Sequence, residues 1–323
     1  MTLFKPILLS LLFLLCKQAV ADTPVTLRIG TLAGGTLAWE LAAMKDQGLP
    51  TTAAFTVETV TLANQQAGKI ALQSGSVDMI LSDWIWASAM RDVGTDYSFY
   101  PYSTAAGGLM VANASPIRAL SDLQGKRIGI AGGELDKNWL LLQALAKRQT
   151  IDLARVTTPV YGAAPLLNEQ LKQGRIDALL TYWHFGARLE AQGYRQLIGG
   201  DELLRQLGIA GNVPTLGYVF RQSWAEKNQD AFNQFLTATQ TAKKRLCDSD
   251  AAWAKVATLT DTSDLATQVQ LRKRYCQGRI VAWGDAERAA SQTLYALLHG
   301  LHDNKLTGPS AHLNQDIFWR ADR

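Results

Sequence analysis

The sequence predicts an α/β protein built from two similar lobes that are joined by two extended segments. The first observation is an internal repeat: Arg28-Ile29-Gly30 recurs as Arg127-Ile128-Gly129, and residues 71–84 recur as residues 170–183, both at an offset of 99. The second is the alternation of strand and helix patterns within each repeat. That alternation is typical of parallel βαβ units, and two similar units imply two lobes.

Within each unit, the pattern predicts the order strand, helix, strand, helix, strand. Leu37, Leu41 and Met44 recur at helical spacing, which predicts the first helix. The predicted strands are 26–31, 55–60, 77–81, 127–131, 156–161 and 176–181, and the predicted helices are 36–47, 64–73, 137–147 and 165–172.

Two extended apolar runs connect the lobes. Residues 98–102 lead into a run at 109–111, and residues 213–220 are placed to cross back. We therefore assign residues 22–108 to the first part of lobe I, 109–214 to lobe II, and 215–323 to the return to lobe I with the C-terminal helices. Those helices are predicted at 229–246, 251–258, 265–275 and 285–299, packed on lobe I. Two crossings form a hinge, with a cleft for a small ligand between the lobes.

The first 21 residues carry the pattern of a cleavable export signal. Lys5 precedes an apolar run at residues 7–15, which is too short to span a membrane, and Ala19-Val20-Ala21 fits the motif read by signal peptidase. We expect residues 1–21 to be removed by cleavage after Ala21. Loss of Lys5 and Lys17 lowers the formal net charge from +4 to +2, a field too weak to indicate a nucleic-acid partner.

Export also changes the interpretation of the three cysteines. Cys16 is lost with the signal, which leaves Cys247 and Cys276. In an oxidising compartment such a pair is expected to form a disulfide, with two buried free thiols as the alternative. The bridge would close a loop of about 30 residues and add about 3.5 kcal/mol of stability in the chain-entropy model.

The ligand site is expected beyond the carboxyl ends of the strands, where open α/β sheets bind ligands. Glycine pairs there precede helices, so their N–H groups can face an electronegative ligand atom, although they can equally be simple tight turns. Aromatic residues at strand ends can stack on a planar ligand or hold a cation, or they can be core residues beneath the loops. Asp83 can accept hydrogen bonds from an amino group. The candidate ligand-binding residues are Gly34, Gly35, Thr36, Trp39, Ser82, Asp83, Trp84, Trp86, Tyr102, Ser103, Gly132, Gly133, Tyr182, Trp183 and His184.

Several of these motifs resemble those of a known family. The motifs are G-G-T-x-x-W-E at 34–40, S-D-W-x-W at 82–86, P-Y-S at 101–103, G-K-R-I-G-I-A-G-G at 125–133 and G-x-I-D-A-L-L at 174–180. They look like periplasmic substrate-binding proteins of ABC importers, within the nitrate, sulfonate, taurine and thiamine-pyrimidine (SsuA/THI5-like) group. The resemblance spans about residues 22–220. It implies the bilobed type II periplasmic binding protein fold, which closes on a solute and delivers it to a membrane permease.

The resemblance implies two ligand classes. Sulfonate binders of the group hold their anion with backbone amides and hydroxyls, whereas pyrimidine binders use aromatic stacking and carboxylates. This sequence offers both sets, and its aromatic and acidic residues favour a planar or amino-bearing organic solute. The implied partners are the permease and ATPase subunits of an importer. The protein is expected to work as a periplasmic monomer without cofactor or metal.

Enzyme interpretations find little support in the sequence. The motifs G-x-G-x-x-G and G-x-S-x-G are absent, and Gly125-Lys126 is followed by arginine instead of the serine or threonine of a P-loop. His299, His302 and His312 lie near the C-terminus without metal-binding spacing. Two alternatives to import remain. One is a sensor that presents its ligand to a membrane receptor, and the other is a THI5-like biosynthetic enzyme. The eukaryotic pyrimidine synthases of this fold carry a cysteine-rich motif that the chain lacks.

Overall fold

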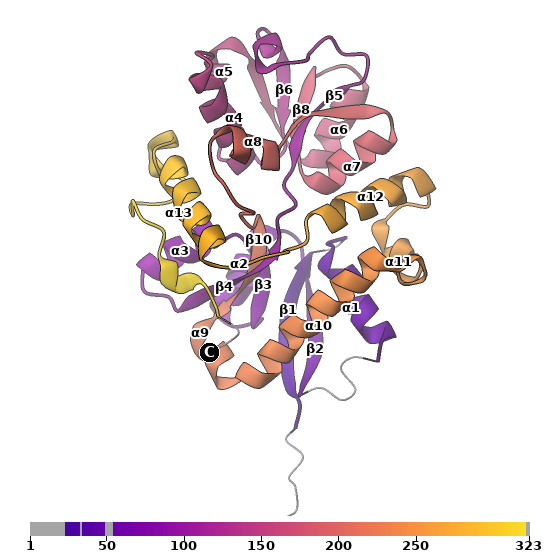
Figure 1. Cartoon of the computed structure of the whole chain (residues 1–323), viewed down its shortest axis with the longest axis vertical. Helices are drawn as coiled ribbons and strands as arrows, with labels where there is room; N and C mark the ends of the chain where they lie inside the picture. The colour runs from indigo at the N-terminus through magenta and orange to yellow at the C-terminus, as the bar shows by residue number, and fades with distance from the viewer. Residues whose placement is uncertain (1–22, 33, 49–53, 321–323) are drawn as a thin grey trace, which may run out of the picture.

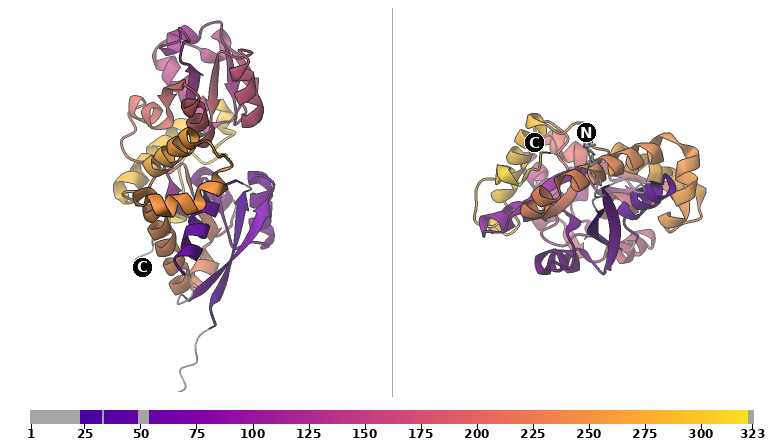
Figure 2. Two further views of the ribbon diagram at one scale, coloured as in Figure 1. Left: turned by 90° about the vertical axis from the view of Figure 1, so that its right-hand side faces the viewer. Right: turned by 90° about the horizontal axis from the view of Figure 1, so that it is seen from below.

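Two five-stranded sheets form the centres of two lobes that are stacked along the long axis of the molecule (Figures 1 and 2). The structure is a computed structural model that describes residues 23–32, 34–48 and 54–320, so the predicted export signal lies outside the described residues. The first sheet has the strand order β2-β1-β3-β10-β4, and the second has the order β7-β6-β8-β5-β9. We call the halves built on these sheets lobe I and lobe II.

The elements of each lobe have the following bounds. Lobe I contains β1 (Val25–Leu32), α1 (Leu37–Asp46), β2 (Phe55–Leu62), α2 (Gln65–Ser74), β3 (Met79–Ser82), α3 (Trp84–Asp92), β4 (Tyr97–Ser103) and β10 (Leu216–Arg221). Lobe II contains β5 (Gly108–Ala112), η1 (Leu120–Leu123), β6 (Arg127–Ile130), α4 (Lys137–Arg148), α5 (Leu153–Val156), β7 (Thr158–Tyr161), α6 (Ala164–Lys172), β8 (Ala178–Thr181), α7 (Trp183–Ala191), β9 (Tyr194–Gly199) and α8 (Gly200–Gln206). The remaining elements are α9 (Gln222–Lys227), α10 (Gln229–Asp248), α11 (Asp250–Val256), η2 (Ala257–Thr260), α12 (Leu265–Gln277), α13 (Asp285–His299), η3 (His302–Asn304) and η4 (Gln315–Ile317).

The chain passes between the lobes twice, from β4 to β5 and from α8 to β10. In lobe I, β1 is parallel to β2 and β3, while the returning β10 is antiparallel to β3 and β4. Lobe II repeats the pattern: β6 is parallel to β7 and β8, while the arriving β5 is antiparallel to β8 and β9. The predicted α/β class and two-lobed architecture are confirmed.

Equivalent contacts recur in the two lobes at the offset that the sequence repeat predicts. Arg28 donates its backbone N–H to the Asp78 carboxylate at 2.9 Å, and Arg127 donates to Asp177 in the same way at 2.8 Å. In return, the N–H of each aspartate donates to the carbonyl of the same arginine. Each aspartate therefore ties the start of one strand to the turn before the next, which explains why the repeat keeps this pair.

The C-terminal helices differ from the prediction in one respect. Helix α10 packs on α1 and β2 of lobe I as expected, but α12 packs on α7 of lobe II, and α13 contacts α4. Arg274 on α12 donates Nε–H to Glu190 on α7 at 2.8 Å, and Arg188 on α7 donates to the carbonyl of Thr260 at 2.6 Å. In Figure 1, α12 and α13 lie on opposite sides of the crossings. The C-terminal part of the chain therefore connects the two lobes on two flanks.

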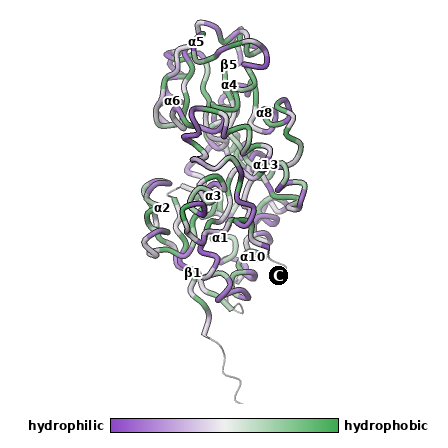
Figure 3. Tube along the Cα trace, turned by 90° about the vertical axis from the view of Figure 1, so that its left-hand side faces the viewer, coloured by the Kyte–Doolittle hydropathy of each residue, from purple (hydrophilic) through white to green (hydrophobic). Residues whose placement is uncertain are grey.

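Hydrophobic residues run through the middle of both lobes (Figure 3). In lobe I, Phe55 on β2 and Tyr218 on β10 both meet Phe235 on α10 edge to face, with ring centroids 5.9 and 5.5 Å apart. Aromatic pairs in this geometry add stability beyond the apolar area that they bury. This packing fixes α10 across the sheet of lobe I.

Strand β4 forms one edge of its sheet, and its outer side is partly covered. The N–H of Trp319 donates to the carbonyl of Phe99 at 3.0 Å, so the C-terminal segment follows part of this edge. The next outward-facing position is Pro101, which has no N–H to donate. A proline on an exposed edge discourages pairing with another strand.

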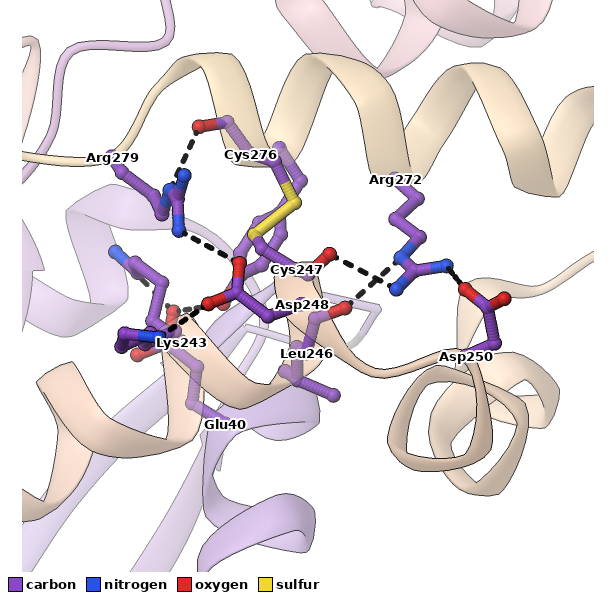
Figure 4. Close-up of a disulfide and its surroundings, with 11 residues drawn as sticks. Glu40, Lys243, Leu246, Cys247, Asp248, Asp250, Arg272, Cys276 and Arg279 are labelled. Atoms are coloured by element: carbon purple, nitrogen blue, oxygen red, sulfur yellow. Dashed lines mark hydrogen bonds and ion pairs between the residues drawn. A yellow bond between two sulfur atoms is a disulfide. The ribbon is translucent and has the colours of Figure 1, made fainter.

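Cys247 on α10 and Cys276 on α12 form the predicted disulfide (Figure 4). Beside it, Arg272 on α12 donates to the carbonyls of Leu246 and Cys247, both at 3.0 Å. These carbonyls belong to the last turn of α10, where no intrahelical donor remains. The disulfide therefore joins the helix that packs on lobe I to the helix that contacts lobe II.

Replacing Cys247 and Cys276 together with serine should lower the free energy of unfolding by about 3.5 kcal/mol, because the bridge limits the freedom of the unfolded chain. The loop is set by a sequence separation of 29 residues. Urea unfolding of the variant and the wild type measures the difference. Wild type treated with a reductant is the control and should lose the same amount. An unchanged unfolding midpoint in both samples would contradict this account.

Candidate functional site

Charged groups from the two lobes approach each other where the strands of the two sheets end. Burial lowers the pKa of the Lys137 ammonium at the start of α4, and the carboxylate of Asp83 at the start of α3 acts in the opposite direction. Asp83 follows β3 in lobe I, whereas Lys137 follows β6 in lobe II. We define the interlobe site by the residues at which strands end and the following helices begin, which are 34–36 and 82–83 in lobe I and 132–133, 136–137 and 181–184 in lobe II.

Four helices begin at this site, and their first turns differ in charge. Asp83 accepts a hydrogen bond from the N–H of Trp86 and caps α3, and Asp136 caps α4 by accepting from Trp139. Among the residues that the structure describes, no side chain caps α1 or α7. A helix start that a carboxylate already caps repels an anion, whereas an uncapped start attracts one. The site therefore has uncapped helix starts at α1 and α7 and capping carboxylates at α3 and α4; the one carboxylate in the first turn of α1, Glu40, pairs with Lys243.

Two buried hydroxyls stand at equivalent strand ends. Ser82 ends β3 and Thr181 ends β8, and each residue is only 2% exposed. Neither hydroxyl oxygen has a hydrogen-bond partner in the part of the chain that the structure describes. A buried hydroxyl without a partner is costly, so such groups in a site are ready to bond to a ligand. Ser82 was predicted for the site, but Thr181 was not.

Lys137 was also missed by the sequence reasoning. It is half-buried and makes no ion pair in the described ranges, although Asp83 and Asp136 both raise its pKa against the effect of burial. A lysine at the first position of a helix that follows a glycine pair was a signal that could have identified it. Its free ammonium is the main cationic group of the interlobe site.

One glycine in each of the two glycine turns has a positive φ angle. Gly34 has a φ of +70° and its repeat equivalent Gly133 has a φ of +78°. Both angles lie in the left-handed region, where residues with a Cβ are strained. Beside Gly133, a Cβ on Gly132 would lie 2.1 Å from the Asp136 carboxylate, so glycine is required for the capping aspartate to fold back.

Two of the predicted aromatic residues lie in the core of lobe I and not at a ligand surface. Trp84 is 0% exposed, and its indole N–H donates to the carbonyl of Pro214 at 2.9 Å. Trp39 is 3% exposed and donates to the carbonyl of Leu259 at 3.0 Å. Both indoles are fully enclosed and hydrogen-bonded, which matches the alternative that they are core residues. We therefore remove them from the ligand surface.

Three further candidates are engaged in contacts with neighbouring groups of the protein. Trp86 packs on Tyr97, with ring centroids 5.4 Å apart. Tyr102 is 5% exposed, and its hydroxyl lies 3.0 Å from the hydroxyl of Thr36, so it supports the loop before α1 from beneath. Ser103 donates to the carbonyl of Gly278 at 3.1 Å, at the beginning of the first crossing.

The aromatic residues of lobe II do reach the site. Tyr182 is 40% exposed, its hydroxyl donates to the carbonyl of Ala131 at 3.3 Å, and its ring stacks near His184 with centroids 6.1 Å apart. Trp183 is half-buried and packs against the hydrophobic cluster of lobe I. Burial, together with Arg188, lowers the pKa of His184 from 6.5 to about 4, so its imidazole is neutral at pH 7.

A buried carboxylate supports the lobe I side of the site. Glu40 on α1 is 0% exposed, accepts a hydrogen bond from the Tyr275 hydroxyl at 2.7 Å and pairs with Lys243 at 3.3 Å. Lys243 also donates to the carbonyl of Tyr102 at 2.5 Å. Burial raises the pKa of Glu40, and Lys243 opposes that rise. The cluster joins α1, α10, α12 and β4 directly below the loop at residues 34–36.

No group of histidine, cysteine, aspartate and glutamate side chains within the described ranges could hold a metal ion. Among the helices of the same ranges, none has the length and hydropathy that a membrane span requires.

The strand orders, the two crossings and the interlobe site together define the two-lobed periplasmic binding protein fold. Residues 99–249 match the model of the NMT1/THI5-like family. This match supports the group that the sequence motifs predicted. A search of curated proteins found no match.

Solved structures with the same fold cover nearly the whole chain. The alkanesulfonate-binding protein SsuA from Xanthomonas axonopodis pv. citri, bound to MOPS, is 21% identical with a TM-score of 0.68, covering 93% of this chain and 100% of that one. The periplasmic aliphatic sulphonate binding protein SsuA from Escherichia coli is 19% identical with a TM-score of 0.73, at 92% and 93% coverage. The periplasmic nitrate-binding protein NrtA from Synechocystis PCC 6803 is 13% identical with a TM-score of 0.62, at 93% and 87% coverage.

The two repeat-equivalent tryptophans should respond differently to replacement by alanine. Trp84→Ala should lower the free energy of unfolding by about 3 to 5 kcal/mol, because it empties a fully enclosed core position. Trp183→Ala should cost less, because its side chain is only half-buried at the contact between the lobes. Urea unfolding of both variants measures the order, and a larger loss for Trp183→Ala would contradict the assignment of Trp84 to the core.

His184 should make the folded protein less stable as the pH falls from about 6.5 to 4. In that range the unfolded chain binds a proton at this residue and the folded chain does not, so stability is present at pH 7 and is lost on acidification. His184→Gln should therefore show a smaller fall in melting temperature between pH 7 and pH 4.5. The exposed His312 provides the matched control, since His312→Gln should keep the wild-type pH dependence. Equal slopes for wild type and His184→Gln would refute the assignment.

Proposed function

We propose that this protein is the periplasmic solute-binding component of an ABC importer, and that it binds a small organic solute at the interlobe site. The fold and the NMT1/THI5-like match support a solute-binding role. The structural neighbours are described as binding proteins for sulfonates and nitrate, not as enzymes. The disulfide fits a periplasmic location, because such bonds persist in oxidising compartments.

The observation that carries the ligand proposal is the facing pair of Asp83 and Lys137. A solute with an acidic group can place that group at Lys137 and at the uncapped ends of α1 and α7. An amino group on the same solute can donate to Asp83. The free hydroxyls of Ser82 and Thr181 supply further hydrogen bonds. We therefore favour a small amino-bearing sulfonate, similar in chemistry to taurine.

An aminopyrimidine is the second candidate, and one observation supports it. Tyr182 and His184 stack at an interplanar angle of 15° and form an aromatic wall on lobe II. The indoles of Trp39 and Trp84 do not supply an opposite wall, because both are enclosed in lobe I. A planar ligand would therefore stack on one side only, which weakens this candidate relative to the amino-sulfonate.

Binding would act by a shift between open and closed forms. Lobe I supplies Asp83 and lobe II supplies Lys137, so a ligand that touches both gains most of its contacts when the lobes are together. A ligand stabilises a conformation by its differential contacts with that conformation. The closed form would then deliver the solute to the permease of the importer.

Taurine should raise the melting temperature of the protein more than ethanesulfonate, which has the same anionic group and no amine. A bound ligand stabilises only the native state, so the shift reports affinity. Asp83→Asn should remove most of the preference for taurine, and Lys137→Met should weaken binding of both compounds by about tenfold or more, equivalent to ~1.4 kcal/mol. Calorimetry on the same variants measures the affinities.

The same melting-temperature measurements are made with nitrate, longer alkylsulfonates and aminopyrimidines. Arg205→Gln on α8 is the control, because it removes a positive charge outside the interlobe site. Equal responses to taurine and ethanesulfonate would refute the role of Asp83. A response to aminopyrimidine alone would replace the sulfonate assignment with the second candidate.

A further inference from the structure

A groove runs beside the edge strand β4, outside the interlobe site. Its walls are β4, α10, the segment that joins α12 to α13, and the last residues of the described chain. It consists of two cavities of about 430 and 610 Å³, which are neighbours because both are lined by Tyr100, Pro101, Gln240, Ile280 and Val281. In Figure 1 the joining segment crosses the molecule at the level between the lobes. The volumes lie in the range of small-molecule sites.

The charged side chains that line this groove are almost all cationic. One carboxylate, Glu40, is present, and Lys243 already pairs with it at 3.3 Å. Asp248 and Asp285 lie outside the lining residues and pair with cations of the wall. The lining cations are Lys243, Lys244, Arg279, Arg288 and Arg320. Five cations against three carboxylates leave the groove with an excess of positive charge.

The charged and tryptophan side chains that line the larger cavity are all hydrogen-bond donors. Arg320 makes no ion pair in the described residues, and the Arg288 guanidinium lies 6.0 Å from the ring centre of Trp283. The indole N–H groups of Trp283 and Trp319 are buried without an acceptor in the described part of the chain, and Trp319 is only 9% exposed. Buried donors without acceptors are costly, and they favour an occupant that brings acceptor atoms.

The middle of the groove is apolar. Val281 is 85% exposed, the highest value among the large hydrophobic residues that the structure describes, and with Ile280 it lines both cavities together with Pro101 and Tyr100 on β4. Because Pro101 cannot donate a backbone hydrogen bond, this side of β4 is suited to a compact apolar body and not to an added strand.

We propose that this groove is a second ligand site, and that it binds a small aromatic or branched organic anion. The apolar body lies between β4 and Val281, where the two cavities meet. The acidic group lies at Arg288 and Arg320, with Trp283 and Trp319 as neighbouring donors. The site is independent of the solute that occupies the interlobe site, since the two share no charged residue.

Titration with 4-fluorobenzoate, observed by ¹⁹F NMR, tests this proposal on the exported protein. Wild type should show saturable binding. Val281→Trp should weaken it by about tenfold, equivalent to ~1.4 kcal/mol, because the indole fills the space where the cavities meet. The double variant Arg288→Gln, Arg320→Gln should weaken it similarly, because it removes the charges that face the carboxylate.

Two controls separate this site from general effects and from the interlobe site. Val93, at the end of α3, is 73% exposed, so Val93→Trp adds the same indole elsewhere and should leave the affinity unchanged. Lys137→Met disables the interlobe site and should also leave it unchanged. The proposal is overturned if wild type shows no saturable binding up to about 10 mM, equivalent to ~2.7 kcal/mol. It is also overturned if both groove variants bind as wild type does, or if only Lys137→Met loses the probe. If the wild-type protein binds 4-fluorobenzoate as expected but does not bind taurine, the result contradicts the proposed function and leaves the groove proposal standing.

Discussion

The buried carboxylate of Glu40 constrains more of this structure than any other single group. A carboxyl group in an apolar interior is stable only when charged and polar partners stay within reach, and here the partners are Lys243 on α10 and Tyr275 on α12. Both helices must therefore keep their positions over α1. The disulfide between Cys247 and Cys276 holds the same two helices together, one turn from Lys243 and one residue from Tyr275 (Figure 4). Because α12 also packs on α7, this constraint extends from the core of lobe I to the contact between the lobes.

The two lobes share one framework but use it differently. The repeat places Asp83 and Tyr182 at equivalent positions, yet the aspartate caps its helix and the tyrosine leaves its helix uncapped. Trp84 and Trp183 are likewise equivalent, but one fills the core of lobe I while the other packs across the lobe boundary. A symmetric frame with asymmetric chemistry can hold a ligand whose two ends differ in charge.

The sequence predicted the α/β class, the repeat, the crossings and the disulfide, because these depend on local periodicity, glycine turns and cysteine count. It did not show helices α3 and α7, whose aromatic first turns hide the helical pattern, nor strand β9. It placed glycine turns between the strands and the helices that follow them, but it could not distinguish Trp84 in the core from Tyr182 at the surface. That difference depends on which residues pack above each strand end, and Pro214 and Tyr295 come from far along the chain. Lys137 was missed for the same reason, since its significance depends on Asp83 in the other lobe.

The path of the chain also sets the order in which the lobes can be completed. All five strands of lobe II lie within residues 108–199, whereas the sheet of lobe I needs β10, which follows more than a hundred residues after its neighbours β3 and β4. Contacts between distant parts of a sequence carry a higher entropic cost before they form, and they slow folding. The chain is synthesised from its amino terminus, so all the strands of lobe II have been made before the last strand of lobe I. The first lobe to be synthesised is therefore the last to complete its sheet, because β4 and one edge of β3 stay unpaired until β10 at residues 216–221 has been made.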